Sequence, residues 1–595
     1  MQNAETVLNV LRERGRRGLP CDELYRQLFN PHLYLLAYGR IYSNHGAMTP
    51  GACGETADGM SEAKIGRIIH AVRGERFRFS PTRRVYIPKK NGKKRPLGLP
   101  SWSDKLVGEV VRLLLEAYYE PRFSDHSHGF RPRRGCHTAL ADVTHNWTGT
   151  TWFIEGDISD CFGSLDHEVM VSTLAEKIHD NRFLRLIKQM LQAGYLEDWV
   201  WHATLSGAPQ GGVTSPILSN VYLDRLDTFV ETVLIPEYTR GQIRATNPAY
   251  LEIANTINRI RQRCLRTGEN LSSTEVRELR KRLRRLPSKD PQDPGYRRLR
   301  YVRYADDHLL GFIGPKAEAE EIKQRLSAFL RDDLKLELNE DKTLITHART
   351  YAARFLGYEV IAQHNNSKLV NGRRSANGII GLRVPRTVIK AKCAPYLKRG
   401  KPTYLPLLMN LSDYDIIRLY GAQFRGIVQY YLPAVDVWRL ERLRWVMLTS
   451  MLKTLAAKHR STVTTMANRY KTVIVTPHGR RRCFEASVER VGRKPLVARF
   501  GGTPLKRQRQ AVIDDRILPL VVTPRRMELV DRLRRGRCEL CDKRTTVEVH
   551  QVRKLADLAT PRSPQPAWVH IMARKRRKTL IVCSPCHENI HEPQA

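Results

Sequence analysis

The feature that most constrains the fold is a pair of adjacent acids between two apolar segments, in the sequence YVRYADDHLLGF at residues 301–312. Tyr, Val, Leu and Phe are typical of β-strands, so this segment is predicted to form a hairpin with Asp306 and Asp307 at its turn. Taken alone, two adjacent acids are equally typical of a solvated turn. A catalytic interpretation therefore depends on other acids that the fold brings to the same place.

A further acid follows a second apolar segment. The sequence TWFIEGDISDCFGSL at residues 151–165 predicts a strand that ends at Asp157 and continues into a polar turn. Carboxylates at the ends of two strands can converge, and Mg²⁺ needs only a few oxygen ligands because it keeps part of its water. Divalent ions hold the attacking hydroxyl, the phosphate and the leaving group in line during phosphoryl transfer. We predict that Asp157 and Asp306, supported by Asp307, bind a pair of Mg²⁺ ions.

The tetrad Tyr-Ala-Asp-Asp at residues 304–307 resembles the catalytic signature of reverse transcriptases. Other segments resemble the companion motifs of that family and occur in the family's order. They are RRVYIPKKNGKKRPLGLP (83–100) and HGFRPRRGCHTAL (128–140) of the fingers, SGAPQGGVTSPILSNVYLD (206–224) of the template loop and its helix, and LELNEDKT (336–343) and RFLGYEV (354–360) of the last palm motifs and the primer grip. The resemblance implies a polymerase that copies RNA into DNA from dNTPs.

Within these motifs, the resemblance assigns nucleotide and template contacts to two loops. Lys89 and Arg95 on the fingers hairpin would neutralise the triphosphate. Gly211 would let the backbone approach the base pair closely, and Gln210 would supply a polar contact that tolerates any sequence. Without the family, these segments would be an exposed basic hairpin and a Gly-Gly turn before a helix.

Two further side chains are assigned by position. Phe162 lies five residues beyond Asp157, where the family's aromatic residue excludes the ribose 2′ hydroxyl and so selects deoxynucleotides. Lys342 stands where the family has a lysine near the pyrophosphate. The alternatives are a core Phe beneath the turn and a solvated Lys.

The net charge indicates a polyanionic partner. The chain has 101 Lys and Arg against 60 Asp and Glu, a formal net charge of +41, which is typical of proteins that bind nucleic acid. Such an excess also suits a membrane surface, but the sequence has no apolar run of about 18 residues and no N-terminal signal. We therefore expect no membrane partner. A merely basic soluble protein is the remaining alternative.

Segments outside the polymerase motifs resemble those of group II intron-encoded proteins. IYSNHGAMTPGACGETADGMS at residues 41–61 resembles their N-terminal extension, although Ala52-Cys53 stands where family members often have Val-Asp. GAQFRGIVQYY at 421–431 and RLERLRWVMLTSMLKTLAAKHRSTVTTMANRY at 439–470 resemble domain X, the thumb and maturase region. Without the family, domain X would be only a basic helical bundle.

Two segments between these motifs are interpreted from composition. An insertion at about 228–300 is predicted to be charged helix that lies on RNA. From about 481 to 530 the chain is basic and rich in Pro and Gly, which predicts loops at the position of the family's DNA-binding region.

Four cysteines near the C-terminus predict a metal site. Cys538 and Cys541 form one C-x-x-C pair, and Cys583 and Cys586 form another. Two such pairs can close a tetrahedral Zn²⁺ site that stabilises the fold. The alternative is four free thiols.

The segments around these cysteines, VEVHQVRKLADL (547–558) and KTLIVCSPCHENIH (578–591), resemble an HNH endonuclease domain. By position, His550, His587 and His591 match the ligands of a second divalent ion, and Gln551 stands where the family has its general base. A carboxamide cannot accept a proton from water near neutral pH. We therefore expect DNA binding with weak or absent cleavage. The alternative for His550 is a structural histidine.

Together these features predict an α+β right-hand polymerase with fingers and palm, a helical thumb, a DNA-binding region and a small zinc-bound HNH-like ββα module. The predicted boundaries are 1–75 for the N-terminal extension, 76–380 for fingers and palm, 381–480 for domain X, 481–530 for the DNA-binding region and 531–595 for the HNH-like domain.

The predicted function is that of a reverse transcriptase and maturase that binds its group II intron RNA, assists splicing and copies the intron at a nicked DNA target. One alternative is an RNA-binding maturase without a polymerase role, which the intact Asp157, Asp306 and Asp307 disfavour. A reverse transcriptase recruited to host defence is another, which the maturase-like and nuclease-like regions disfavour. The expected location is the cytoplasm of a bacterium, in association with the nucleoid, or an organelle.

Overall fold

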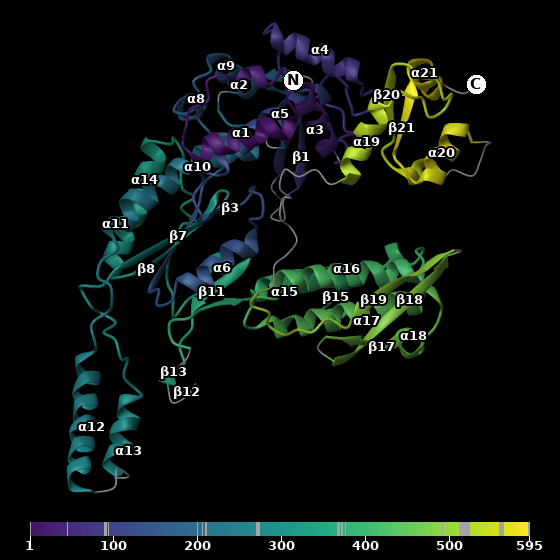
Figure 1. Ribbon diagram of the computed structural model, residues 1–595. Coiled ribbons are helices and arrows are strands. Elements are labelled where there is room, and N and C mark those ends of the chain that lie inside the picture. Colours follow the sequence, from purple (N-terminus) through teal and green to yellow (C-terminus); the bar gives the residue numbers. More distant parts are fainter. Residues whose placement is uncertain are drawn as a thin grey trace.

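The structure is a computed structural model that describes residues 2–592 apart from residues 45, 89–91, 93, 199, 205, 209–210, 269–273, 366–368, 371–372, 375, 478, 491, 511–523 and 559–564. Two predicted contact residues, Lys89 and Gln210, lie outside the described residues. Helices and strands occur together throughout the described chain, as the predicted mixed α/β class requires (Figure 1). Among the described residues, no helix is both long and apolar enough to cross a membrane.

A five-stranded sheet, called the central sheet below, carries the predicted acids. Its strands lie in the order β3 (Ser127–His128), β7 (Arg298–Tyr304), β8 (Asp307–Ile313), β4 (Trp152–Asp157) and β9 (Ile345–His347). The predicted hairpin at 301–312 is confirmed, because β7 and β8 pair antiparallel across a two-residue turn. The strand predicted to end at Asp157 is confirmed as β4, which pairs antiparallel with β8.

Successive side chains of these strands point to opposite faces of the central sheet, so each face has its own core. Ile154 and Leu310 belong to a large core that includes α5 (Trp102–Tyr119), α10 (Ser215–Phe229) and α14 (Lys316–Asp332). Phe153, Val302 and Leu309 belong to a second core shared with α6 (Cys136–Asn146) and the helices after residue 385. The near-continuous apolar runs in β4 and β8 follow from this burial on both sides.

The N-terminal part of the chain is helical and ends in a small sheet. Helices α1 (Ala4–Arg16) and α3 (Pro31–Ile41) pack on α5, whose residues are almost all buried. The hairpin predicted within 83–100 is confirmed as β1 (Thr82–Pro88) and β2 (Lys94–Leu99), in a sheet of order β2-β1-β5-β6 with β5 (Tyr195–Glu197) and β6 (Val200–His202).

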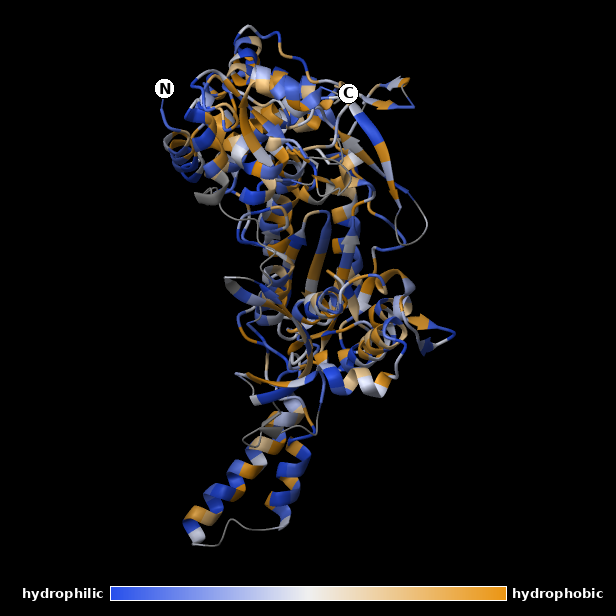
Figure 2. Ribbon diagram, turned by 90° about the vertical axis from the view of Figure 1, so that its right-hand side faces the viewer, coloured by the Kyte–Doolittle hydropathy of each residue, from blue (hydrophilic) through white to orange (hydrophobic). Residues whose placement is uncertain are grey.

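The insertion at about 228–300 forms a helical hairpin of α12 (Pro248–Thr267) and α13 (Thr274–Leu283), which agrees with the predicted charged helix. The hairpin extends away from the rest of the chain in two views at right angles (Figures 1 and 2). Helix α12 has no buried residue, and α13 buries only Val276.

The helices predicted for domain X are present as α15 (Arg386–Cys393), α16 (Asp413–Tyr431), α17 (Glu441–Lys458) and α18 (Val463–Tyr470). The loops predicted for 481–530 are wrong for its first part. Strands β18 (Gly479–Arg490) and β19 (Arg493–Gly501) lie there instead, and they form an antiparallel sheet, called the basic sheet below, with β17 (Lys471–Thr476). Strand β17 lies at the end of the region predicted as helical domain X. The Gly and Pro content misled the prediction, because Gly492 lies between β18 and β19, Gly501 ends β19 and Pro495 lies near its start.

The C-terminal module comprises α19 (Pro524–Arg534), β20 (Val547–Gln551), α20 (Ala567–Lys575), β21 (Thr579–Cys583) and α21 (Ser584–His591). The predicted ββα unit is β20, β21 and α21, with β20 and β21 antiparallel. The module lies beside the N-terminal helices, and Val530, Val549 and Ile581 join the same core as those helices (Figure 1).

Shorter elements complete the described chain. They are α2 (Leu24–Gln27), α4 (Glu62–Arg73), α7 (Cys161–Ser164), α8 (His167–Ala175), α9 (Asn181–Leu191), the π-helical turn Val230–Leu234, α11 (Ile235–Glu237), β10 (Ala353–Phe355), β11 (Tyr358–Ala362), β12 (Leu369–Val370), β13 (Arg373–Arg374), β14 (Ile380–Arg383), β15 (Leu397–Lys398), β16 (Lys401–Pro402) and the 3₁₀ turns Ala394–Tyr396, Pro406–Leu408, Val437–Leu440 and Leu555–Leu558.

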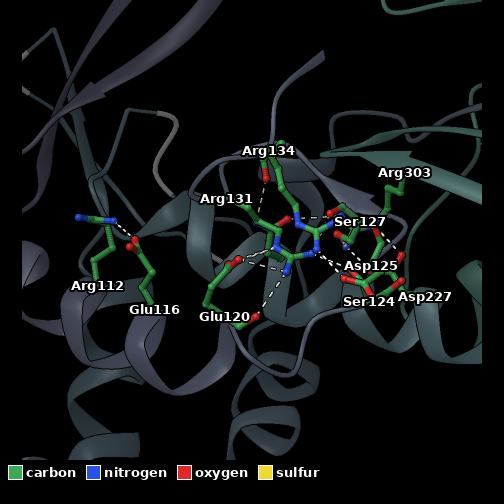
Figure 3. Close-up of polar contacts among 12 residues, drawn as sticks. Arg112, Glu116, Glu120, Ser124, Asp125, Ser127, Arg131, Arg134, Asp227 and Arg303 are labelled. Atoms are coloured by element: carbon green, nitrogen blue, oxygen red, sulfur yellow. Dashed lines mark hydrogen bonds and ion pairs between the residues drawn. The ribbon is translucent and has the colours of Figure 1, made fainter. Parts of the chain in front are cut away.

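A buried ion pair fixes the β7–β8 turn. Arg303 and Asp227 are 0% and 1% exposed, and the guanidinium donates to both carboxylate oxygens, at 2.7 and 2.5 Å. Arg303 also donates to the Ser127 hydroxyl at 2.8 Å and to the carbonyl oxygen of Ala305, inside the turn, at 2.9 Å. Tyr301 donates its hydroxyl to Asp227 at 2.8 Å. Figure 3 shows Arg303 and Asp227 facing each other beside Ser127.

A second arginine extends this network. Arg131 donates to the carbonyl oxygens of Ser124 and Ser127 at 2.6 and 2.7 Å and to the Glu120 carboxylate at 3.1 Å (Figure 3). Ser127 therefore receives bonds from both arginines, on its hydroxyl and its carbonyl. Strand β3 is thus tied to both the end of α5 and the turn of β7 and β8.

The buried pair can be tested by removing one partner. Arg303→Met leaves Asp227 as an uncompensated buried charge, so we expect a loss of about 3–5 kcal/mol in the free energy of unfolding. The measurement is urea unfolding, followed by hydrogen exchange at the amides of β7 and β8. Arg325→Met is the matched control, since the Arg325–Glu237 pair is 32% and 49% exposed and its loss should cost less than about 1 kcal/mol. Equal losses in both variants would contradict the role of burial.

Candidate active site and metal centres

The three predicted acids lie on adjacent strands of the central sheet. Asp157, the last residue of β4, stands opposite Asp307, the first residue of β8. Asp306 occupies the turn between β7 and β8, after Ala305, whose φ of 55° makes the chain reverse sharply. The structure therefore brings the predicted residues to one edge of the sheet, as their positions at strand ends required.

Burial and repulsion between carboxylates raise the pKa values of Asp306 and Asp307. Burial, then the charge of Asp306 and the contacts with Asp157, raise the pKa of Asp307 from 3.8 to about 7. Burial raises the pKa of Asp306, an effect to which the charge of Asp157 adds and which Arg95 and Lys342 oppose. Carboxylates crowded in this way bind a divalent cation favourably, because the cation relieves the repulsion.

The three carboxylates are not drawn into a tight cage. In the described part of the chain, two other groups have ligand atoms that all lie within 4.8 Å of one another, and the three aspartates are not among them.

Two predicted cations lie at the acids. Lys342 donates from Nζ to Oδ2 of Asp157 at 2.7 Å, and this bond raises the pKa of Lys342. The segment that carries Lys342 is itself attached to the strand end, since the amide of Asn339 donates to the carbonyl oxygen of Asp157 at 2.8 Å. Arg95, on β2, is close enough to lower the pKa of Asp306 by its charge.

Phe162 is half-buried beside the acids. Its ring packs edge-to-face on Phe130, with centroids 6.0 Å apart. Its carbonyl oxygen accepts from the amide of Ala208 at 2.8 Å, which holds the loop before α10 against α7. Gly207 makes this approach possible, since a Cβ there would lie 2.7 Å from the carbonyl oxygens of Phe162 and Gly163.

Gly211 lies against the fingers hairpin. Its φ of +100° is a conformation that L side chains rarely adopt, and a Cβ would meet the Leu97 side chain at 2.6 Å. The glycine is therefore needed for the loop to pass under β2. Arg95 lies on the same strand, β2, two residues before Leu97.

A further contact, which the sequence did not predict, joins the primer-grip motif to α16. Tyr430 donates its hydroxyl to the carbonyl oxygen of Leu356 at 2.6 Å, and Tyr431 donates to that of Gly357 at 3.0 Å. Leu356 and Gly357 have φ values of 47° and 72°, so the bonds fix a strained turn. The adjacent tyrosines at the end of a helix were the one signal available.

The four predicted cysteines converge. The sulfur atoms of Cys538, Cys541, Cys583 and Cys586 all lie within 4.8 Å of one another. Although burial opposes it, backbone hydrogen bonds from Cys541, Cys583 and Leu540 lower the pKa of Cys538 to about 7, which favours the thiolate form that binds metal. The donor set fits a tetrahedral zinc ion.

The three predicted histidines also converge, with an unpredicted fourth member. Ligand atoms of His550, His587, His591 and Asp58 lie within 4.8 Å of one another. Asp58 lies in the N-terminal segment at 41–61, so no spacing in the C-terminal sequence could have indicated it. Gln551 is buried and donates its side-chain amide to the carbonyl oxygen of Tyr42 at 2.8 Å.

The raised pKa of Asp307 leads to a pH prediction. Between pH 3.8 and about 7 the folded protein holds a proton that the unfolded chain releases, so stability falls as pH rises through this window. Asp307→Asn removes that loss. In EDTA at pH 8 we expect the variant to be about 1–3 kcal/mol more stable than the native chain, and the two to converge at pH 4.

Thermal unfolding at several pH values is the measurement. Asp104 and Asp224, whose pKa values burial also raises to about 7, are common to both proteins and cancel in the comparison. Added Mg²⁺ should stabilise the native chain more than the variant. Parallel pH profiles for the two proteins would contradict the assignment.

Comparison with known proteins places three family regions along the chain. Residues 87–360 match the reverse transcriptase (RNA-dependent DNA polymerase) family. Residues 381–494 match type II intron maturase, and residues 538–587 match the AI2M/AI1M-like HNH endonuclease family.

Similar proteins span almost the whole chain. Group II intron-encoded protein LtrA of Lactococcus lactis subsp. cremoris is 38% identical over 586 residues, which cover 95% of each chain. The putative COX1/OXI3 intron 1 protein of Saccharomyces cerevisiae is 30% identical over 95% of this chain and 68% of its own. A solved telomerase from Candida albicans, in complex with an RNA fragment, matches 66% of this chain and 62% of its own at 12% identity and a TM-score of 0.30, too low to bear on the fold.

Identity at this level along both chains, with the polymerase, maturase and HNH regions in the same molecule, means that the chain belongs to the group II intron-encoded proteins and is an RNA-directed DNA polymerase and intron maturase.

Proposed function

We propose that Asp157, Asp306 and Asp307 are the catalytic acids of this polymerase and hold two Mg²⁺ ions. The observation that carries the proposal is the pairing of Asp157 with Asp307 on adjacent strands, next to Asp306 in the turn. When bound, the ions supply the charge that orients the primer 3′ hydroxyl and the triphosphate for in-line transfer. The central sheet would be the palm of a right-hand polymerase, with the β1–β2 hairpin as part of the fingers and α15–α18 as the thumb.

The side chains around the acids would position the incoming dNTP. Arg95 and Lys342 are cations within electrostatic reach of the acids, which suits contact with a triphosphate. In this proposal, Lys342, which bonds to Asp157 in this structure, would contact the pyrophosphate when the nucleotide is bound. Gly211 would let the backbone approach the base pair. Lys89 and Gln210 remain predictions for the triphosphate and the template.

The nucleic-acid partners would be the intron RNA and a nicked DNA target, copied in place. Three basic parts support this: the α12–α13 hairpin, the helices α15–α18, and the basic sheet, where Arg480, Arg481 and Arg482 are exposed. Arginines that contact phosphates bind tightly without reading sequence, and folded RNA is recognised mainly by shape. The proposed site of action is a bacterial cytoplasm near the nucleoid, or an organelle.

The C-terminal module would hold a structural zinc ion at Cys538, Cys541, Cys583 and Cys586. We further propose that it binds target DNA with weak or absent cleavage. In support, the position of the general base is Gln551, whose amide is committed to Tyr42. A second divalent ion would be held at His550, His587 and His591.

The polymerase proposal is tested by primer extension on an RNA template with Mg²⁺ and dNTPs. Asp306→Ala should reduce the rate by at least about 10²-fold, because the missing charge acts directly on the transferred phosphate. Asp332→Ala, at an exposed acid paired with Arg331, is the control and should extend normally. Equal rates for Asp306→Ala and the native chain would favour the alternative, a maturase whose polymerase is not used.

Phe162 is tested by nucleotide choice. Phe162→Ala should raise kcat/KM for ribonucleotides relative to deoxynucleotides by roughly 10- to 100-fold, because the ring would no longer exclude the 2′ hydroxyl. Phe162→Tyr keeps the ring and should keep the discrimination. If Phe162→Ala slows both kinds of nucleotide equally, the residue only packs beneath the turn, against Phe130.

A further inference from the structure

The histidine cluster of the C-terminal module is completed by a residue from the opposite end of the chain. Asp58 Oδ2 lies 2.9 Å from Nε2 of His591 and 3.4 Å from Nε2 of His587, and its Oδ1 lies 3.4 Å from Nδ1 of His550. The ligand atoms of all four residues lie within 4.8 Å of one another. One carboxylate therefore faces three imidazole rings.

His550 is the most deeply buried histidine of the cluster and is suited to bind a metal. Residue His550 is 4% exposed; in the described part of the chain its Nδ1 has only the 3.4 Å contact with Oδ1 of Asp58, and its Nε2 has no hydrogen-bond partner. Buried polar atoms nearly always have a partner, and a lone pair that meets no donor is the form of imidazole that binds metal. The rings of His587 and His591 lie 5.4 and 5.3 Å from the His550 ring, so the three rings converge on one point.

The surroundings orient His587 for the same role. Its Nδ1 is 3.0 Å from Oε2 of Glu548, and Oε1 of Glu548 accepts from the Ser584 hydroxyl at 2.8 Å. A carboxylate on one ring nitrogen fixes the proton there and directs the other nitrogen, with its lone pair, toward a metal. In this protein that other nitrogen is Nε2, which faces Asp58.

Asp58 is held in place by the backbone. The amide of Gly59 donates to the carbonyl oxygen of Val549 at 3.0 Å, and the amide of Val549 donates to that of Met60 at 2.9 Å. The amide of Gln551 donates to Oδ1 of Asp58 at 2.6 Å. The N-terminal segment thus forms an isolated antiparallel bridge from Met60 to Val549 of β20, with Asp58 directed into the cluster.

We propose that Asp58, His550, His587 and His591 form a closed four-ligand site for a zinc-type divalent cation, which clamps the N-terminal segment to the C-terminal module. Three imidazoles and one carboxylate suit tetrahedral Zn²⁺. This clamp shares one premise with the proposed function, namely that the three histidines hold a divalent ion. It does not depend on polymerase activity.

A closed site has a structural role. A catalytic zinc keeps one position for water or substrate, whereas four protein ligands fill a tetrahedral ion. A scissile phosphate could therefore reach the ion only if Asp58 withdrew. Because the ligands come from both ends of the chain, the affinity for the ion includes the energy of docking the module, and removing the ion should loosen that contact.

The test uses the full-length protein and zinc itself. Elemental analysis should find two zinc ions per chain, one for each ligand group. Dialysis against a mild chelator should remove one of them from Asp58→Asn under conditions that leave both in the native chain. Loss of an outer partner of a zinc ligand already weakens binding by about 10- to 100-fold, so loss of Asp58 should cost at least about tenfold.

Further variants keep the outcome interpretable. His591→Asn changes a ligand whose side chain is 55% exposed, so it should lose the same ion without unfolding the module. Asp198→Asn, at an exposed acid in a fingers turn, should retain both ions. Hydrogen exchange at the amides of Gly59 and Val549 should accelerate in Asp58→Asn and in the chelated native chain, and stay slow in Asp198→Asn.

Two results would overturn the clamp. One is a native chain that holds a single zinc ion. The other is an Asp58→Asn variant that keeps two ions with unchanged resistance to the chelator and unchanged exchange at Gly59. Primer extension by the same preparations reports separately on the polymerase, so failure of one proposal is distinguishable from failure of the other.

Discussion

The fully buried pair of Arg303 and Asp227 is the interaction on which the geometry of the proposed active site depends. The three acids at the edge of the central sheet repel one another, so their own electrostatics would drive the β7–β8 turn open. Arg303 prevents this by binding Asp227 on α10, Ser127 on β3 and the carbonyl oxygen of Ala305 inside the turn. Desolvation makes such a pair costly to break, which suits a framework that must hold like charges together.

Hydrogen bonds also attach helix α16 to the turn at Leu356 and Gly357, in the segment that resembles the primer grip. Tyr430 and Tyr431 at the end of α16 bind the carbonyl oxygens of a turn with left-handed backbone, and Nε2 of His137 on α6 lies 2.7 Å from the carbonyl oxygen of Tyr430. The helix that would grip the primer is therefore attached to the turn that would position its 3′ end. Because these hydrogen bonds are direct, a movement of the thumb would also move that turn.

Local sequence patterns predicted most helices and strands, but contacts between residues far apart in the sequence could not be predicted. The positions of Asp157, Asp306 and Asp307 at strand ends were predictable, because an apolar run stops at each of them. The cysteine cluster was predictable because two C-x-x-C pairs are the usual spacing of a zinc site. Lys342 was assigned to a pyrophosphate by position, yet its bond to Asp157 depends on how the chain after α14 returns to β4. The region 481–530 was predicted as loops because of its Gly and Pro, but Gly492 and Gly501 mark the turn and the strand end of the basic sheet. The roles of Arg303 and Asp58 could not be predicted, because their partners are far from them in sequence and only the fold brings them together.

In the described chain, each candidate centre gathers groups that are unfavourable without a further charge. The three aspartates crowd against one another, the four thiols lie within 4.8 Å of one another, and His550 buries an Nε2 atom that has no hydrogen-bond partner there. A divalent cation would relieve each of these costs, so metal binding at the proposed centres would be coupled to folding. The surface has the opposite imbalance, since a net charge of +41 destabilises the compact state until phosphates neutralise it. Cations at the buried centres and nucleic acid on the surface therefore act in the same direction, and the fully liganded ribonucleoprotein should be markedly more stable than the chain alone.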